Sequence, residues 1–457
     1  MKKENYVNSS TTARHNKKPN RIRESLALAT CSLMATSPQA TAAEEYKAPW
    51  EIDSSILYYE EKDRVIATKP MVGLRKDIGD DEYLGIRIVA DALTGASPNG
   101  AAPTDSPQTF TSPSGRRTYT TPANEIPLDR TFKDTRGSIS TDWEKPLTET
   151  LKGIFGLNLS VETDYTSLGV SSTFNKDFNQ RHTTLTIGAS LNFDTIKPTG
   201  SAPIGLFPMS GVSGGDDNEG STKKKNVAEL LIGVTQVINR FTLTQANYSI
   251  GKNSGYLNDP YKLLSVLDLN GSGDLRATDP YVYEKRPKER TYQSLYWKGV
   301  HQLKNEDVIN ISYRYFWDDW DIKSHTVDLH YRWELGSGHY LQPHIRYYQQ
   351  YAAKFYRQTL VDGDELLLDY ASADYRLGNF TTQTIGLKYG IFFNSGAEIN
   401  FRVETMQQRG ETESSDAIGK LSNINLYPDM DASIIQASIS LDTNIISMFF
   451  GKLFGKN

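Results

Sequence analysis

Apolar and polar residues alternate along most of this chain after residue 50. Between residues 327 and 335, Val, Leu, Tyr, Trp and Leu alternate with Asp, His, Arg and Glu. The same period of two recurs at 157–161, 185–193, 309–315, 385–393 and 397–403. Because successive side chains of a β-strand point to opposite faces, each segment predicts a strand with one apolar and one polar face. We therefore expect an all-β protein.

Counting these segments predicts about 16 strands, within a range of roughly 14 to 18. The expected strands are residues 50–62, 64–77, 82–93, 137–146, 153–166, 168–176, 181–195, 225–238, 240–253, 291–303, 305–319, 322–336, 338–352, 376–393, 395–410 and 430–443. Many are joined by short turns, and an even number of strands with long loops on one side is typical of membrane barrels. The pattern predicts a single antiparallel transmembrane β-barrel.

A soluble β-sandwich is the alternative, because its strands can alternate in the same way. Three features favour a barrel in lipid. The polar faces carry Arg, Glu, Asp and His in series, which suits a wet or ion-paired lumen. Aromatic residues gather near strand ends, as at 313–317 and 347–348, where a membrane barrel has its aromatic girdles. Closing the sheet on itself also satisfies every backbone group within the membrane.

The composition excludes several classes of protein. The formal net charge of −5 argues against nucleic acid as a partner. No stretch approaches the roughly 18 consecutive apolar residues of a membrane-spanning helix, which excludes a helical integral membrane protein. A single cysteine, Cys31, excludes a disulfide scaffold. Because no motif of nucleophilic or metal-assisted catalysis is present, we do not expect an enzyme.

The first 42 residues have the features of a secretory signal peptide. Basic residues dominate positions 1–24, a short apolar run covers 25–35, and small residues follow at Ala40–Ala43. We expect cleavage after Ala42, which leaves a barrel domain of residues 43–457. The lipobox-like stretch ending at Cys31 leaves a lipoprotein as an alternative. An exported barrel belongs in the outer membrane of a Gram-negative cell, with lipid as its surroundings.

Three long stretches separate predicted strands. Residues 94–136 are rich in Thr, Ser, Pro and Gly, residues 197–224 in Gly and Ser, and residues 254–290 in Asp and Pro. Loops of this length are usually functional or disordered. At the other end of the sequence, the last strand is expected near residues 434–441, although the aromatic tail at 444–457 is a second candidate for it.

Four stretches resemble a bacterial family catalogued as domain of unknown function 3570. They are residues 91–101 (DALTGASPNGA), 313–320 (YRYFWDDW), 342–350 (QPHIRYYQQ) and 373–377 (ADYRL). The resemblance covers nearly the whole mature chain. It implies an outer-membrane barrel of Gram-negative bacteria without an assigned activity. It also implies an association with envelope flavin-transferase systems, so a periplasmic flavin transferase and envelope redox proteins become expected partners.

The stretch from Asp91 to Ser97 is similar to the acceptor motif of envelope flavin transferases. In that family an Asp, two variable residues, Ser or Thr, Gly and Ala precede the hydroxyl residue that receives FMN as a phosphoester. Matched by position, Asp91, Thr94, Gly95 and Ala96 form the motif and Ser97 is the candidate site of covalent FMN attachment. The alternative is a plain turn that leaves the preceding strand, because Gly, Pro, Asn and Ser dominate turns.

Residues 268–279 (DLNGSGDLRATD) resemble an EF-hand or dockerin-type calcium loop. Oxygen ligands recur at alternate positions with a glycine at the sixth, as such loops require. The candidate ligands are Asp268, Asn270, Ser272, the carbonyl of Asp274, and Asp279. Ser272 and the short side chain of Asp279 predict weak affinity. The alternative is an Asp- and Gly-rich surface turn.

These observations lead to two hypotheses about function. The first is an outer-membrane barrel of an envelope redox or transport system, with FMN on Ser97 and calcium in a loop as candidate cofactors. The second is a passive diffusion channel or exporter without a cofactor, whose inward Arg and Glu rows set selectivity. The lumen is either an open pore or bridged by charged residues on the polar strand faces, namely Arg332, Glu334, Arg402 and Glu404. His330 and His344 also lie on polar faces, where we expect them to be ion-pair partners, with a role as ligands as the alternative.

Overall fold

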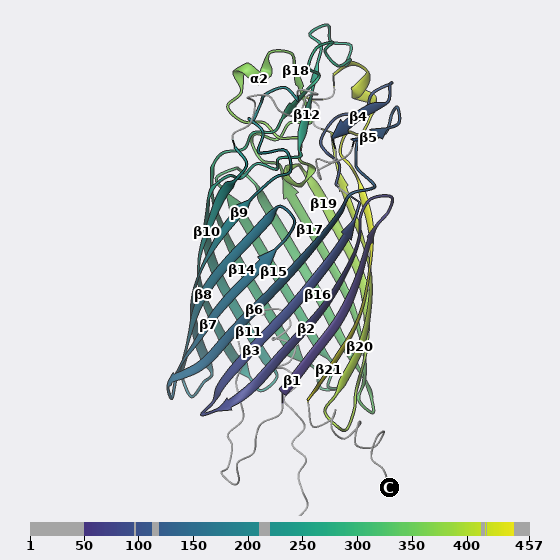
Figure 1. Ribbon diagram of the computed structural model, residues 1–457. Helices are drawn as coiled ribbons and strands as arrows, with labels where there is room; N and C mark the ends of the chain where they lie inside the picture. Colours follow the sequence, from purple (N-terminus) through teal and green to yellow (C-terminus); the bar gives the residue numbers. More distant parts are fainter. Residues whose placement is uncertain are drawn as a thin grey trace, which may run out of the picture. The chain divides into compact units, whose positions relative to one another are not determined.

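The computed structural model describes residues 50–95, 97–111, 118–209, 220–412, 416 and 418–442. Sixteen of its strands form one closed antiparallel barrel (Figure 1). In barrel order the strands are β1 (Trp50–Glu61), β2 (Ile66–Gly79), β3 (Glu82–Thr94), β6 (Lys133–Thr148), β7 (Leu151–Val161), β8 (Tyr165–Phe178), β9 (Thr183–Ile196), β10 (Lys223–Asn239), β11 (Thr242–Gly255), β14 (Glu289–Gln302), β15 (Val308–Asp318), β16 (Lys323–Gly336), β17 (His339–Tyr351), β19 (Phe380–Phe392), β20 (Glu398–Gly410) and β21 (Met430–Asp442). The predicted fold class is confirmed, and each predicted strand corresponds to one of these.

The barrel closes where β1 pairs with β21. Their antiparallel register runs from Glu51 opposite Asp442 to Glu61 opposite Ala432. Residues 430–442 therefore form the closing strand, as expected for the stretch near 434–441. The tail at 443–457 lies outside the described residues, as do the predicted signal peptide at 1–42 and Cys31.

The two faces of the wall have opposite chemistry. Large apolar side chains on the outer face are exposed, among them Ile385 (61%), Leu157 (59%) and Leu230 (57%). Charged and amide side chains on the inner face are buried, among them Lys298 and Asp194. In water this apolar outer surface would be costly to hydrate, whereas the tails of lipids solvate it. No helix in the described ranges is long and apolar enough to cross a membrane.

Connections differ between the two ends of the barrel. At one end the turns are short: Asp80 and Asp81 join β2 to β3, and Ser337 and Gly338 join β16 to β17, all with positive φ. Such two-residue turns match the twist of antiparallel strands. At the other end there are five long connections, at residues 95–132, 197–222, 256–288, 352–379 and 411–429. The first three were predicted from the sequence as long connections, and the last two were not.

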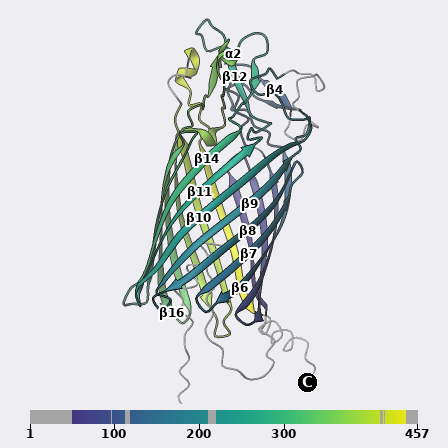
Figure 2. The same ribbon diagram turned by 90° about the vertical axis from the view of Figure 1, so that its left-hand side faces the viewer.

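The five long connections assemble into one folded unit, called the cap here (Figures 1 and 2). Its centre is β12 (Leu263–Leu267), in which every residue is buried. On one side β12 pairs antiparallel with β13 (Tyr281–Tyr283), and on the other it pairs parallel with β18 (Thr359–Val361). The smaller elements of the cap are β4 (Gln108–Thr111), β5 (Thr118–Thr121), α2 (Asp364–Leu367) and the 3₁₀ turns η1 (Tyr375–Leu377) and η2 (Gly419–Asn423).

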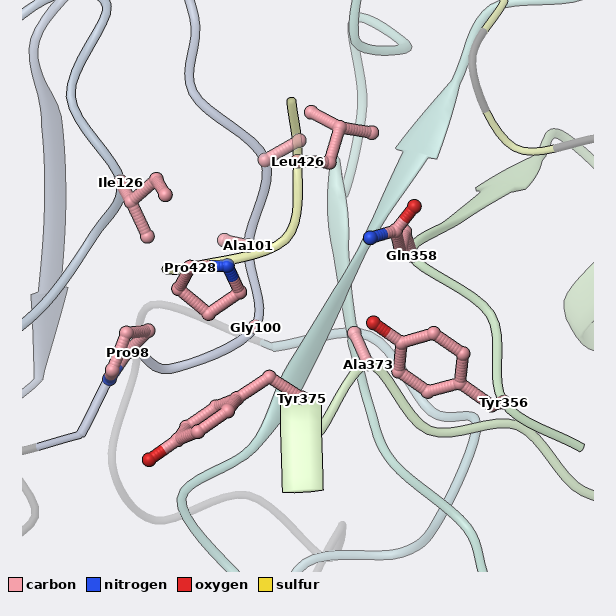
Figure 3. A pocket seen from close by; sticks show the side chains of 11 residues that line it. Pro98, Gly100, Ala101, Ile126, Tyr356, Gln358, Ala373, Tyr375, Leu426 and Pro428 are labelled. Atoms are coloured by element: carbon pink, nitrogen blue, oxygen red, sulfur yellow. The ribbon is translucent and has the colours of Figure 1, made fainter. Parts of the chain in front are cut away.

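The cap has an apolar core of its own, distinct from the wet barrel. Leu264, Val266, Val282 and Leu360 are at most 1% exposed and pack together from different connections. A second cluster joins Leu267 to residues of the 411–429 connection, including Leu421. Figure 3 shows where the connections 95–132, 352–379 and 411–429 meet, around a cavity of about 20 Å³. A cavity of this size holds no more than a water molecule, so the connections are tightly packed.

Candidate functional site

Glycines on the inner face allow neighbouring side chains to lie flat along the wall. A Cβ at Gly386 would lie 2.5 Å from Cγ of Glu404, and a Cβ at Gly390 would lie 2.2 Å from the ring of Tyr340. Both distances are far below normal contact, so glycine alone fits there. The inner wall is thus lined by polar side chains that reach across strands to partners two strands away.

Two imidazoles stack on the inner wall between β16 and β17. His330 and His344 are direct cross-strand partners, and their ring centroids lie 4.1 Å apart with an interplanar angle of 7°. Both rings contact the same carboxylate: Nε2 of His330 is 2.9 Å from Oδ1 of Asp328, and Nε2 of His344 is 3.1 Å from Oδ2. Both histidines were predicted as ion-pair partners, whereas the role of Asp328 as the carboxylate they share was not.

Glu404 holds the second imidazole from the opposite side. Its Oε1 lies 2.8 Å from Nδ1 of His344, although the strand β19 runs between them. The contact is possible because Gly386 is the residue of β19 opposite both His344 and Glu404. Nη1 of Arg402 lies 3.5 Å from the same Glu404 oxygen, along one strand. Both nitrogens of His344 therefore face carboxylates.

An ammonium group lies close to this cluster. Lys298 of β14 is 1% exposed, and its Nζ has no hydrogen-bond partner among the residues that the structure describes. The charge of Asp328 acts on it. A buried ammonium without an acceptor is costly, so the position is a candidate for contact with a bound solute or water.

Two of the charged residues named from the sequence form an ion pair along one strand. Nε of Arg332 lies 2.7 Å from Oε1 of Glu334, two residues further along β16. The guanidinium of Arg332 also lies 3.8 Å from the ring centroid of Tyr340 on the adjacent strand. Arg332 thus contacts its own strand and the adjacent one.

Several charged side chains that point inward are nevertheless exposed to solvent. Arg314 of β15 and Arg346 of β17 alternate with outward Tyr313 and Tyr347, so both point inward, and both are exposed. Neither takes part in an ion pair within the described residues. Glu229 of β10 is also inward and exposed. Inward residues can be exposed only if the lumen contains space that water reaches.

The cap is anchored on the lumen side of the barrel rim. Nε2 of Gln350, near the end of β17, donates to the backbone oxygens of Arg376 and Gly378 at 2.8 and 3.1 Å. Nε2 of Gln408, near the end of β20, donates to Oη of Tyr427 at 2.8 Å. Because both glutamines point inward, these cap segments are attached to the inner face of the barrel at that end.

A buried charge network holds the connections of the cap together. Nη2 of Arg286 lies 2.8 Å from Oδ2 of Asp374, and its Nε lies 2.7 Å from Oε1 of Glu284. Burial raises the pKa of the Glu284 carboxyl. Burial would also raise the pKa of Asp374, but Arg376, Lys262 and Arg286 outweigh it and hold that pKa well below its usual range. The pKa of Glu284 is therefore raised and that of Asp374 lowered, although the two carboxyls contact the same Arg286.

The predicted flavin motif spans the end of β3 and the start of the following connection. Asp91 points into the lumen, where Arg136 lies 2.5 Å and Lys69 3.4 Å from its carboxylate. Thr94 ends β3 with its hydroxyl 3.4 Å from a backbone oxygen. Gly95 has φ +82°, and a Cβ there would meet the backbone oxygen of Arg64 at 1.9 Å, so this position requires glycine. Ala96 lies outside the described residues.

Ser97 lies at the base of the cap, half-buried. Its side chain is hydrogen-bonded with that of Tyr375. It lines a cleft of about 230 Å³ together with aromatic and charged side chains that include Tyr119, Tyr261 and Lys262. Burial lowers the pKa of the Lys262 ammonium, and Nζ of Lys262 donates to the backbone oxygen of Pro98. A hydroxyl, an ammonium and aromatic rings are thus brought together.

The predicted calcium loop is closed by its own hydrogen bonds. The Asp268 amide donates to the carbonyl of Asp274 at 2.9 Å, so the carbonyl expected as a ligand has a backbone donor. The amides of Asn270 and Ser272 donate to the side chains two residues before them. Nζ of Lys420 lies 2.6 Å from Oδ1 of Asp274. Asp279, the proposed last ligand, has φ +51°, and its carbonyl accepts from Arg276.

Similarity to solved structures is limited to the barrel architecture. The chain aligns with a mutant of the ferric enterobactin receptor PfeA from Pseudomonas aeruginosa at 10% identity and a TM-score of 0.41, over 79% of this chain and 54% of the receptor. With OccK2 (OpdF) of the same organism, in complex with glucuronate, the identity is 8% and the TM-score 0.39, over 86% of this chain and 98% of OccK2. With OpdK the identity is 9% and the TM-score 0.38, over 86% of this chain and 99% of OpdK. The chain spans about half the length of the siderophore receptor.

Comparison with curated proteins gives no match. Comparison with protein families gives one match, over residues 23–441. This range includes all sixteen barrel strands and lacks only Asp442, the last residue of β21. The match agrees with the resemblance seen in the four stretches quoted above. The chain belongs to the family described as protein of unknown function DUF3570.

Proposed function

We propose that this protein is an outer-membrane β-barrel of a Gram-negative envelope and provides a pathway for small polar solutes. The observation that supports the proposal is the contrast between the two faces of the wall. The outer face exposes large apolar side chains such as Ile385 and Leu157, whereas inward charged side chains such as Arg346 are exposed to water. Lipid outside and water inside is the arrangement of a transmembrane channel.

The same residues give the pathway a preference for anions. Arg314 and Arg346 point into the lumen without an ion-pair partner in the described residues, so their positive charge acts on passing solutes. The cap lies over the mouth, where Gln350 and Gln408 hold it. Solutes must therefore be small enough to pass the cap, or their passage requires a conformational change of the cap. Within an envelope transport system, this restricts the cargo to small molecules.

Conductance in planar lipid bilayers tests this proposal. The refolded barrel is expected to open steps of ion current, with a reversal potential in a salt gradient that shows anion preference. Replacing both Arg314 and Arg346 by Ala should shift that potential towards cation preference. Lys323→Ala, which removes an outward charge, is the matched control and should leave it unchanged. A purified chain that stays monodisperse without detergent and carries no current overturns the proposal.

Flavin attachment to Ser97 is a second hypothesis, which would make the barrel part of an envelope redox system. Covalent FMN would supply one- or two-electron transfer. The Lys262 ammonium in the Ser97 cleft suits a phosphoester, because the ammonium is positive and the phosphoester is negative. The cleft, about 230 Å³, is smaller than the roughly 300–1,000 Å³ of typical small-molecule pockets. The flavin ring would therefore project out of it.

The position of Ser97 restricts when such a transfer could take place. In outer-membrane barrels the long loops face the exterior and the short turns face the periplasm. Ser97 belongs to a long connection, whereas both ends of the barrel sequence, at β1 and β21, are on the short-turn side. A periplasmic transferase would therefore need to act on Ser97 before the barrel is inserted.

A further inference from the structure

We propose that Asp328, His330 and His344 bind one divalent transition-metal ion, such as Zn²⁺ or Cu²⁺, in the inner wall of the barrel. In the part of the chain that the structure describes, this is the one group of three His, Cys, Asp or Glu side chains whose ligand atoms all lie within 4.8 Å of one another. Two imidazoles and a carboxylate suit Zn²⁺, Cu²⁺ or Ni²⁺ better than Mg²⁺ or Ca²⁺. The site does not depend on whether the lumen conducts.

The backbone register already places the ligands. His330 and His344 are paired residues of β16 and β17, and Asp328 is two residues before His330, hence on the same face. The rings stack at 4.1 Å, with both Nε2 atoms directed at the Asp328 carboxylate. A cation between these nitrogens and the carboxylate would take the place of the protons that they share. Because the ring planes differ by only 7°, at least one ring must turn so that the in-plane lone pairs of the two Nε2 atoms converge on the ion.

The groups behind the ligands also fit a metal site. Metal-binding histidines usually donate their second ring N–H to a carboxylate or another acceptor, which fixes the ring and its tautomer. Nδ1 of His344 has Glu404 at 2.8 Å, and Nδ1 of His330 has the amide of Gln342 at 3.2 Å. The orientation of a Gln amide is assigned from its neighbours, so its oxygen can equally face that nitrogen. Both Nε2 atoms then remain free for a cation.

The charges around the site set its affinity. Asp328 offsets one positive charge of the ion, and Glu404, which also pairs with Arg402, offsets part of the other. The Lys298 ammonium, which is buried and acts on Asp328, opposes it. Removing this ammonium should therefore strengthen metal binding. Lys298→Met keeps much of the side-chain volume, so it separates the charge effect from a packing defect.

Electron paramagnetic resonance with Cu²⁺ as the probe tests the site directly. The full chain, purified in detergent without a polyhistidine tag and treated with chelator, is titrated with Cu²⁺ alone. One equivalent is expected to bind, with hyperfine structure from two nitrogen ligands. His330→Gln and His344→Gln should each remove one nitrogen and weaken binding by more than about 10-fold. His301→Gln, on the outer face, is the matched control and should change neither.

Two further variants keep all three ligands. Glu404→Gln should weaken binding by roughly 10-fold while two nitrogens remain in the spectrum, as expected for a group that orients a ligand. Lys298→Met should bind Cu²⁺ more tightly than the unaltered chain. The proposal is overturned if no equivalent binds, or if the spectra of His330→Gln and His344→Gln equal that of the unaltered chain. Circular dichroism on the same samples shows that each variant has folded.

Discussion

Tyr340 reaches Glu398 across a strand that has no side chain at the crossing point. Its hydroxyl donates to Oε1 of Glu398, and between the two lies Gly390 of β19, whose missing Cβ makes room for the ring. Tyr340 is fully buried, although it faces a lumen that contains water elsewhere. The wall is therefore packed in places as closely as a soluble protein core.

Gly390→Ala is expected to destabilise the barrel. The added Cβ would lie 2.2 Å from the Tyr340 ring, so the ring must move and its hydrogen bond to Glu398 must break. Overpacking of this kind typically costs about 1–3 kcal/mol. Urea unfolding of the refolded barrel in detergent measures the effect. Gly137→Ala is the control, because nothing lies within 4 Å of a Cβ there; equal stability of the two variants would contradict the argument.

The stability of the cap is expected to fall at acid pH, below about pH 4. The pKa of Asp374 is held below its ordinary 3.8, so its contribution is present above that value and is lost as the pH falls further. Glu284 acts in the opposite direction: its pKa is raised above 4.5, so protonation on mild acidification relieves the cost of its buried charge. The cap should therefore remain folded, or tighten slightly, between neutral pH and about pH 5.

Hydrogen exchange of the peptide that contains β12 measures this pH dependence. Protection should decline only below about pH 4, while strands of the barrel remain protected. Asp374→Asn should weaken the cap by about 3–5 kcal/mol at neutral pH, because Arg286 and Arg376 lose a buried partner. It should also remove the acid-dependent loss. Loss of protection already between pH 8 and pH 6 would rule out this assignment.

Intact-mass analysis of protein from its native envelope tests flavin attachment. If Ser97 is the acceptor, the mature chain carries the added mass of one FMN and the denatured band fluoresces. Ser97→Ala should remove both signals, whereas Ser97→Thr should keep them because the hydroxyl is retained. Ser106→Ala, in the same connection, is the control. A native chain with the unmodified mass shows that Ser97 is a turn residue.

Isothermal titration with Ca²⁺ tests the predicted loop at 268–279. Ser272 and Asp279 replace stronger ligands, so binding is expected to be weak, with Kd of roughly 10⁻⁴–10⁻³ M. Asp268→Asn should abolish it, whereas Asp321→Asn in a rim turn should have no effect. Lys420 already stabilises the loop by its ion pair with Asp274. If Asp268→Asn binds as the unaltered chain does, the loop is a surface turn.

The barrel could be predicted from the sequence because a strand that faces lipid on one side and water on the other has alternating apolar and polar residues. The period of two located all sixteen strands, including β21. The cap could not be predicted in this way. Its central strand, Leu263–Leu267, is a short apolar run without alternation, and its partners come from distant connections. Nothing local distinguishes such a run from a loop.

The lumen cluster was predicted only in part, for a related reason. His330 and His344 were recognised as inward groups from the pattern of their own strands. The contacts of His344 with Asp328 and Glu404 depend on the register between strands and on Gly386, which has no side chain. Contacts along one strand, such as that of Arg332 with Glu334, follow from spacing alone. Contacts across strands require the folded barrel.

The parallel pairing of β12 with β18 has a consequence for biogenesis. The two strands come from different connections. In the proposed orientation, with the long connections outside the cell, Ser265 can meet Thr359 only after both connections have crossed the bilayer. The core of the cap, which also includes Leu421 of the last connection, would then be complete only once that connection has crossed as well. A barrel arrested during insertion would display frayed, protease-sensitive loops to the outside world, and only a finished one would show a closed surface there.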